Sequence, residues 1–295
     1  MSNRIEFYKN RGIGERLSVA FNFLKQNWKA LYKNILIGGL PLAIIMGYLL
    51  AEVYTARTIL NFDLPHFFLF YALLIFVSFL DTVYLYSMTG AVLHQYERNQ
   101  LTESTGWNDL KDTFFKFAGK TALIFLLVFI PIIFIIVIPA VFLGFTTAFA
   151  SHVPEFAVII LFFALFLMAG FIVFAPFISM LYFPAYFSGK TVWESIKTSF
   201  VLGFKDWGSL FLAIMLLGIV FYIIYMIFYV PLIVSSLFSI GYLSIFSYIF
   251  ATLSAIGMLL SYPVMIVVFA FQYFSIVEKE EGVSLQSRLD DFENL

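Results

Sequence analysis

The chain of 295 residues contains no cysteine and few charged side chains. Without cysteine there is no disulfide framework, no thiolate metal site and no cysteine nucleophile. The glycine-rich nucleotide loops, the HExxH zinc motif and the GxSxG serine motif are also missing. The three histidines, His66, His94 and His152, are too far apart in sequence to predict one metal site. We therefore predict no catalytic, cofactor-binding or metal-binding residues, and a protein that is not an enzyme.

Charged residues make up only 12% of the sequence, whereas soluble domains contain roughly 25%. Apolar residues make up 62%, and the mean hydropathy is +0.96. A water-soluble core cannot absorb this excess, so the composition predicts an all-α integral membrane protein. The N-terminal region lacks the apolar core and cleavage site of a signal peptide. The first span is therefore expected to be an uncleaved anchor.

Long uncharged runs predict six transmembrane helices, because one spanning helix needs about 20 apolar residues. The runs are Asn34–Ala51, Phe67–Leu93 (interrupted by Asp81), Thr121–Pro154, Phe156–Gly189 and Gly208–Val277. The last run has 70 residues and must turn after Pro231. A count of seven stays open, in which the serine-rich segment from Ser235 to Ser247 forms a re-entrant piece.

Lysine and arginine concentrate on one side of this six-span arrangement. The N-terminal segment, the loops 94–120 and 190–205 and the C-terminal tail carry 7, 4, 3 and 2 basic residues, which is 16 of the 17. Arg57 lies on the other side. Because cytoplasmic loops are enriched in basic residues, we predict cytoplasmic N and C termini in a bacterial-type inner (cytoplasmic) membrane.

The chain is predicted to be one membrane domain, 1–295, built from three repeats of roughly 90 residues. Each repeat consists of an amphipathic interfacial helix and a two-span hairpin, over residues 14–93, 104–189 and 190–277. Residues 278–295 form a cytoplasmic tail. Apolar residues recur at steps of three and four before the first, third and fifth spans, among lysines and other polar residues. Thr191 and Glu194 have the spacing of a capping box. The predicted interfacial anchors are Trp28, Trp107, Trp193 and Trp207.

The segment TVWESIKTSFVLGFKDWGSLFLAIMLL resembles a pattern in the membrane domain associated with glycerophosphodiester phosphodiesterases and in related bacterial six-span membrane proteins. An interfacial stretch ending in a serine and an aromatic residue is followed by an aromatic residue near a glycine, and then by a long span. The residues that carry the pattern are Ser199, Phe200, Gly203, Phe204 and Trp207. The resemblance implies a fold and a membrane location, and no catalytic residues in the membrane part.

Asp81 stands alone in the uncharged second span, where a carboxylate is costly. Ser78 and Tyr84 lie one helical turn away on either side, so these three residues form the candidate intramembrane polar site. One hypothesis is a protonated aspartate that is hydrogen-bonded inside the bundle and fastens the second span to its neighbours. The other is a proton or substrate site in a transport pathway. Gln272, near the end of the last span, is interpreted as an interfacial side chain.

Small residues in the last span predict close helix contact. Ser247, Ala251 and Ala255 recur every four residues, as do Gly257 and Ser261. Prolines within the spans, such as Pro41 and Pro263, predict kinks.

Three function hypotheses follow from this reading. The first is a non-enzymatic scaffold or accessory module that engages membrane lipids, a partner protein or a second copy of the chain through its cytoplasmic face. The second is a small transporter or channel centred on Asp81. The third is an intramembrane lipid-modifying enzyme. The basic residues follow the membrane pattern, so nucleic acid is not an expected partner.

Overall fold

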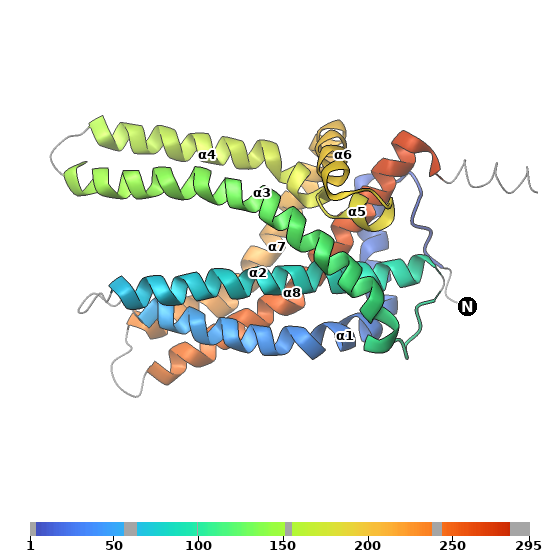
Figure 1. The fold of residues 1–295 in the computed structure, drawn as a ribbon, viewed down its shortest axis with the longest axis horizontal. Coiled ribbons are helices and arrows are strands. Elements are labelled where there is room, and N and C mark those ends of the chain that lie inside the picture. The colour runs from blue at the N-terminus through green and yellow to red at the C-terminus, as the bar shows by residue number, and fades with distance from the viewer. Residues whose placement is uncertain (1–3, 56–63, 99, 151–154, 238–243, 284–295) are drawn as a thin grey trace, which may run out of the picture. The chain divides into compact units, whose positions relative to one another are not determined.

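The computed structural model describes residues 4–55, 64–98, 100–150, 155–237 and 244–283. These residues form helices and connecting segments, with no β-strand among them. Six helices are long and apolar enough to cross a membrane, as the sequence predicts. The predicted re-entrant piece falls largely on residues outside the described ranges. The helices are α1 (Ile13–Thr55), α2 (Leu64–Glu97), α3 (Trp107–Ala150), α4 (Glu155–Met180), α5 (Phe183–Phe187), α6 (Val192–Lys205), α7 (Trp207–Leu237) and α8 (Ser244–Glu281) (Figure 1).

The chain divides into two compact units. Unit 1 combines Met1–Ala118 with Met215–Leu295, and unit 2 is the intervening Gly119–Ile214. The first unit thus joins both ends of the sequence, and the second is one continuous segment. This division does not follow the three predicted repeats, which stay a prediction.

In unit 1, α1 packs along α8 in the antiparallel sense through small residues. A Cβ atom placed on Gly47 would lie 2.8 Å from the backbone nitrogen of Thr252, closer than real Cβ contacts allow. In α8, Ala251 and Ala255 are buried. The small face predicted in the last span therefore meets a matching face on α1, where the small residues also recur every four positions: Gly39, Ala43, Gly47 and Ala51.

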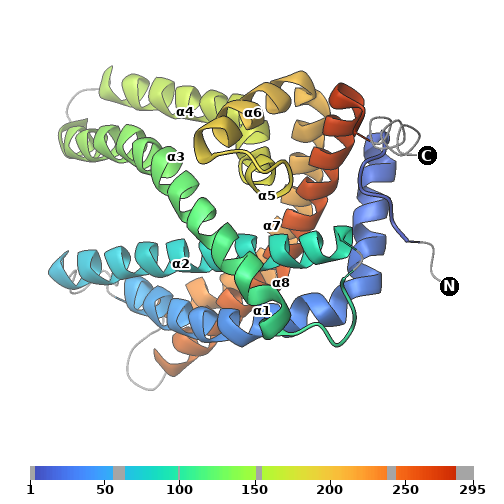
Figure 2. The same cartoon turned by 45° about the vertical axis from the view of Figure 1, so that its right-hand side comes forward.

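The first predicted interfacial helix is not separate from its span. A single helix, α1, runs for 43 residues from Ile13 to Thr55, and Figure 2 shows that its first part (dark blue) meets the rest at a steep angle. The amphipathic segment and the span thus follow each other through a bend. The second predicted interfacial segment is likewise continuous with α3, whereas the third forms its own helix, α6.

A proline interrupts the hydrogen bonds of the last helix of unit 1. Pro263 lies inside α8 and has no N–H to give to the carbonyl four residues earlier. Next to that interruption, the hydroxyl of Tyr32 donates to the carbonyl oxygen of Leu260 at 2.7 Å. This bond ties that part of α8 to α1.

In unit 2, α4 ends at Met180 and the short helix α5 begins at Phe183. The break leaves carbonyl groups at the end of α4 without helical partners. Helix α6 packs against this point so closely that a Cβ atom on Gly203 would lie 2.8 Å from the Cα atom of Phe177. The break and α6 therefore form one packed corner.

We expect Gly47→Leu to destabilise unit 1, because the added side chain must push α8 away from α1. Overpacking of this kind costs about 1–3 kcal/mol. Thermal unfolding of the purified protein in detergent measures the change.

Gly14→Leu is the matched control. A Cβ atom on Gly14 meets no other group within 4 Å, so this variant should unfold within about 0.5 kcal/mol of the parent. Equal stability of the two variants would show that α1 and α8 are not in close contact at Gly47.

Candidate functional site

Asp81 lies inside unit 1 and not on a lipid-facing surface, since only 8% of its surface is exposed. Its Oδ1 atom is buried and has no hydrogen-bond partner among the described residues. Tyr84 and Tyr262, the latter on α8, are close enough to interact with the carboxylate electrostatically. Side chains of α2 and α8 thus lie near a carboxyl group whose Oδ1 atom has no partner among the described residues.

Tyr84 is bonded to the backbone of α1 instead of to Asp81. Its hydroxyl donates to the carbonyl oxygen of Asn34 at 2.7 Å and accepts from the N–H of Gly38 at 3.0 Å. In a regular α-helix these two backbone groups would bond to each other. The Tyr84 hydroxyl therefore bonds to both groups, and insertion of a side chain into the hydrogen-bond ladder is a known cause of helix bending.

The approach of Tyr84 requires glycine at position 38. A Cβ atom there would lie 2.7 Å from the tyrosine ring. Asn34, one turn earlier, is fully buried, and its amide donates to the carbonyl oxygens of Ala30 at 2.8 Å and Thr105 at 3.1 Å. The bonds of Asn34 and Tyr84 and the predicted kink at Pro41 therefore fall in one stretch of α1, and we attribute the bend to them.

Ser78 does not join Asp81 in a hydrogen-bonded network. Its carbonyl oxygen accepts a bond from the Thr82 hydroxyl at 2.8 Å, within α2. The three predicted site residues share a region of α2, but the bonds of Tyr84 and of Ser78 lead away from the carboxylate.

A second polar cluster joins the same three helices where α1 ends and α2 and α8 begin. Glu52 of α1 accepts a hydrogen bond from the Tyr248 hydroxyl at 2.7 Å, and its other oxygen lies 3.1 Å from Nε2 of His66. From the sequence we considered His66 only as a metal ligand, and gave Glu52 no role. The sequence gives only a weak signal for this cluster, because its three residues lie in distant segments and share no regular spacing.

At the other end of unit 1, the N-terminal segment folds back over the helices. Arg4 donates to the carbonyl oxygens of Tyr96 and Glu97 at 3.0 and 2.7 Å, at the end of α2. A cation at this position suits the negative end of the helix dipole. Phe7 is buried in an aromatic cluster whose other members are Phe23, Tyr96, Phe271 and Phe274.

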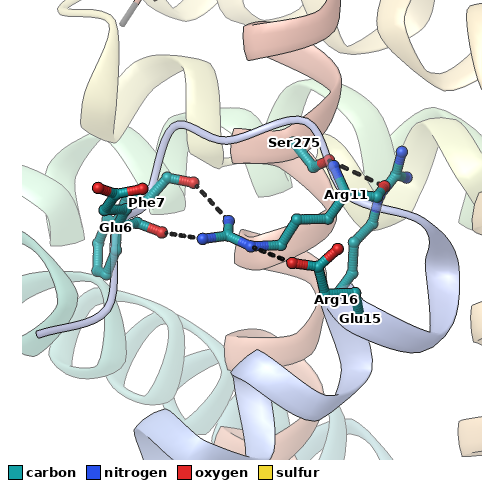
Figure 3. A network of polar contacts seen from close by, with 6 residues as sticks. All are labelled: Glu6, Phe7, Arg11, Glu15, Arg16 and Ser275. Atoms are coloured by element: carbon teal, nitrogen blue, oxygen red, sulfur yellow. Dashed lines mark hydrogen bonds and ion pairs between the residues drawn. The ribbon is translucent and has the colours of Figure 1, made fainter. Parts of the chain in front are cut away.

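Arg11 is the centre of the network that closes this end (Figure 3). Its guanidinium donates to the carbonyl oxygens of Glu6 at 2.6 Å and Phe7 at 3.2 Å, and lies 3.7 Å from the Glu15 carboxylate. Its backbone N–H donates to the Ser275 hydroxyl at 3.0 Å. Burial lowers the pKa of Arg11, and the nearby carboxylates oppose that shift.

Arg16 continues the network into α8. It donates to the carbonyl oxygen of Arg11 at 2.7 Å and to Oε1 of Gln272 at 2.9 Å. Gln272 is fully buried, so our interpretation of it as an interfacial side chain is wrong. Its partner is Arg16 of α1, and sequence periodicity within α8 could not reveal that contact.

The four predicted tryptophan anchors differ in exposure. Trp28 and Trp193 are 55% and 61% exposed, whereas Trp107 and Trp207 are half-buried. Trp207 donates its ring N–H to the carbonyl oxygen of Val173 at 3.3 Å. More than half of the surface of Trp28 and of Trp193 is thus exposed, as expected for interfacial anchors.

Helix α6 buries its small, polar face and exposes its aromatic face. Ser195 and Ser199 donate to the carbonyl oxygens of Leu181 at 3.3 Å and Met180 at 3.1 Å, at the break after α4. The exposed large side chains on the opposite face are Trp193, Phe200, Val201 and Phe204.

The predicted capping box of α6 is confirmed: the Thr191 hydroxyl accepts from the N–H of Glu194, and the Glu194 side chain accepts from the N–H of Thr191. These bonds hold the pKa of Glu194 below its ordinary value. Within the described ranges, no group of three or more histidine, aspartate and glutamate side chains could hold a metal ion.

No protein-family model matches the sequence, and neither a curated protein nor a solved structure shows significant similarity to it. The resemblance to the membrane domain associated with glycerophosphodiester phosphodiesterases therefore stays a prediction.

We expect Tyr84→Phe to straighten α1. Without the hydroxyl, the Asn34 carbonyl and the Gly38 N–H are free to bond to each other, so stability should change by only about 1 kcal/mol. Because the chain has no cysteine, spin labels are introduced cleanly at Gln26 and Ile45, one on each side of the bend. The distance between them, measured by pulsed electron paramagnetic resonance, should increase.

Tyr71→Phe is the control, since Tyr71 lies on the exposed surface of α2. It should leave the distance unchanged. An unchanged distance in Tyr84→Phe as well would mean that the hydroxyl does not cause the bend.

Proposed function

We propose that the protein is a non-enzymatic, six-span inner-membrane scaffold or accessory module that engages anionic lipid through its cytoplasmic face. The observation that carries this proposal is the exposed aromatic and basic surface of α6. Helices with apolar rings on one face and lysines beside them lie in the membrane interface and bind anionic headgroups.

The geometry of α6 supports this role. Nζ of Lys197 lies 5.5 Å from the centre of the Trp193 ring, so the cation sits beside the anchor that would rest at headgroup depth. The capping box and the two serine bonds fix the rotation of the helix. The aromatic face of α6 therefore has a fixed orientation within unit 2. The cytoplasmic assignment rests on the positive-inside distribution of basic residues.

Replacing Lys197 and Lys205 with glutamine should weaken binding of anionic lipid. Each lysine near an anionic surface contributes about 1 kcal/mol, or about fivefold in affinity. The association constant of spin-labelled phosphatidylglycerol relative to phosphatidylcholine, measured in reconstituted vesicles, gives the change.

Arg57→Gln removes a basic residue from the predicted outer side and is the matched control. Its vesicles should retain the parental preference for phosphatidylglycerol. An equal loss in both variants, or no loss in the lysine variant, would contradict the proposal.

A second candidate function is transport through a site centred on Asp81. The observation that favours it is the buried Oδ1 atom without a partner, because a carboxylate that only fastened helices should be fully hydrogen-bonded. A transported proton or a substrate group would supply the missing partner.

Asp81→Asn tests this candidate, because asparagine cannot take up and release a proton. If Asp81 carries protons, proteoliposomes of the variant should lose the proton flux that a trapped pH-sensitive dye reports in the parent. Thermal unfolding should stay within about 1 kcal/mol of the parent, which shows that the loss is not misfolding. Absence of protein-dependent flux in the parent, or equal flux in both proteins, would reject the transport role.

A further inference from the structure

A groove of about 370 Å³ lies between α7 and α8, within unit 1. Its lining alternates aromatic rings with small residues and methionines, and it lies wholly within the two spans. Representative lining residues are Gly218, Tyr222, Tyr225, Phe228, Gly257 and Met265.

The groove is long and narrow. It extends from Gly218 to Phe228 on α7 and from Ser254 to Met265 on α8. At 1.5 Å per residue, these stretches are about 15 Å and about 16 Å long. A volume of about 370 Å³ spread over that length cannot admit a helix, which is about 10–12 Å across. The shape suits an extended chain that runs parallel to the helices.

One end of the groove is closed and the other is open. At the closed end, a Cβ atom on Gly257 would lie 3.1 Å from the Phe228 ring. Beyond it, Leu232 of α7 is buried against Ala51 and Ala251. At the opposite end, a Cβ atom on Gly218 would meet no other group within 4 Å. The groove therefore narrows toward Phe228.

The lining is suited to hydrocarbon and not to a headgroup. It contains no charged side chain. Among the lining serines, the hydroxyl of Ser261 donates to the carbonyl oxygen of Gly257 at 2.7 Å, whereas the buried hydroxyl of Ser254 has no partner among the described residues. Neighbouring side chains of α7 outside the lining are apolar and more than half exposed, as a lipid-facing surface requires: Ile219, Val220 and Ile227.

We infer that this groove is a binding site for one hydrocarbon chain of a membrane lipid. The open end of the groove at Gly218 lies about 16 Å from the start of α7 at Trp207, near the middle of that span. The groove therefore holds the terminal half of the chain, with the headgroup outside. This site is separate from the headgroup-binding surface of α6 and does not depend on it.

Gly218→Phe is designed to fill the groove, because the new ring has open space to enter. The probe is phosphatidylcholine with a photoactivatable diazirine near the end of one acyl chain, incorporated into vesicles with the protein. After illumination, peptide mapping of the parent should find adducts concentrated on Met258 and Met265. Gly218→Phe should lower labelling of these residues at least fivefold.

Gly170→Phe is the matched control, because Gly170 lies within α4 and its Cβ atom would also meet no group within 4 Å. It should label like the parent. A second probe, with the diazirine beside the headgroup, should label Met258 and Met265 weakly in every variant.

Three results would overturn the inference. One is labelling spread evenly over exposed apolar residues of α7 and α8, as expected for lipid that only surrounds the protein. Another is equal labelling of the parent and Gly218→Phe. The third is equal labelling by the two probes. Because phosphatidylcholine has no net charge, none of these results depends on the preference for anionic lipid that the α6 lysines test.

Discussion

The hydroxyl of Tyr84 bonds to the backbone of α1 at Asn34 and Gly38, and these two bonds fix α2 against α1 inside unit 1. The single helix α1 serves two purposes: its first part carries the buried Arg16, and its apolar second part is long enough to span a membrane. A straight helix of 43 residues would be about 65 Å long, roughly twice the thickness of the hydrocarbon core. Because α1 bends, only its second part has to match the thickness of the hydrocarbon core.

Polar bonds join α1 to its neighbours at three levels: Arg16 with Gln272, Tyr84 and Tyr32 with backbone groups, and Glu52 with Tyr248 and His66. Within a bilayer, apolar contact with a neighbouring helix has little advantage over contact with lipid, so close packing and hydrogen bonds must select the partners. The small faces of α1 and α8 supply the close packing. Unit 2 uses the same means, since two serines and Gly203 fix α6 at the break after α4.

Hydropathy predicts the six spanning helices because the bilayer requires long apolar segments whatever their neighbours are. Local rules also predict the cap of α6 and the small face of α8, because each depends on residues within two turns of one helix. Such local rules do not predict contacts between residues that are distant in the sequence. Nothing near Tyr84 in the sequence identifies Gly38 as the donor to its hydroxyl, and nothing in α8 shows that Arg16 of α1 bonds to Gln272. Asp81 is identified by its isolation, but its surroundings include Tyr262 of a separate helix, α8.

The bonds of Arg11 to Ser275 and of Arg16 to Gln272 connect residues 264 and 256 positions apart. Their partners do not exist until the ribosome has made nearly the whole chain. Until α8 arrives, α1 lacks both its close-packed neighbour and these two bonds, whereas unit 2 is one continuous segment whose internal contacts are complete earlier. Biogenesis therefore has an order, in which the middle of the protein can assemble during synthesis and the two ends close last.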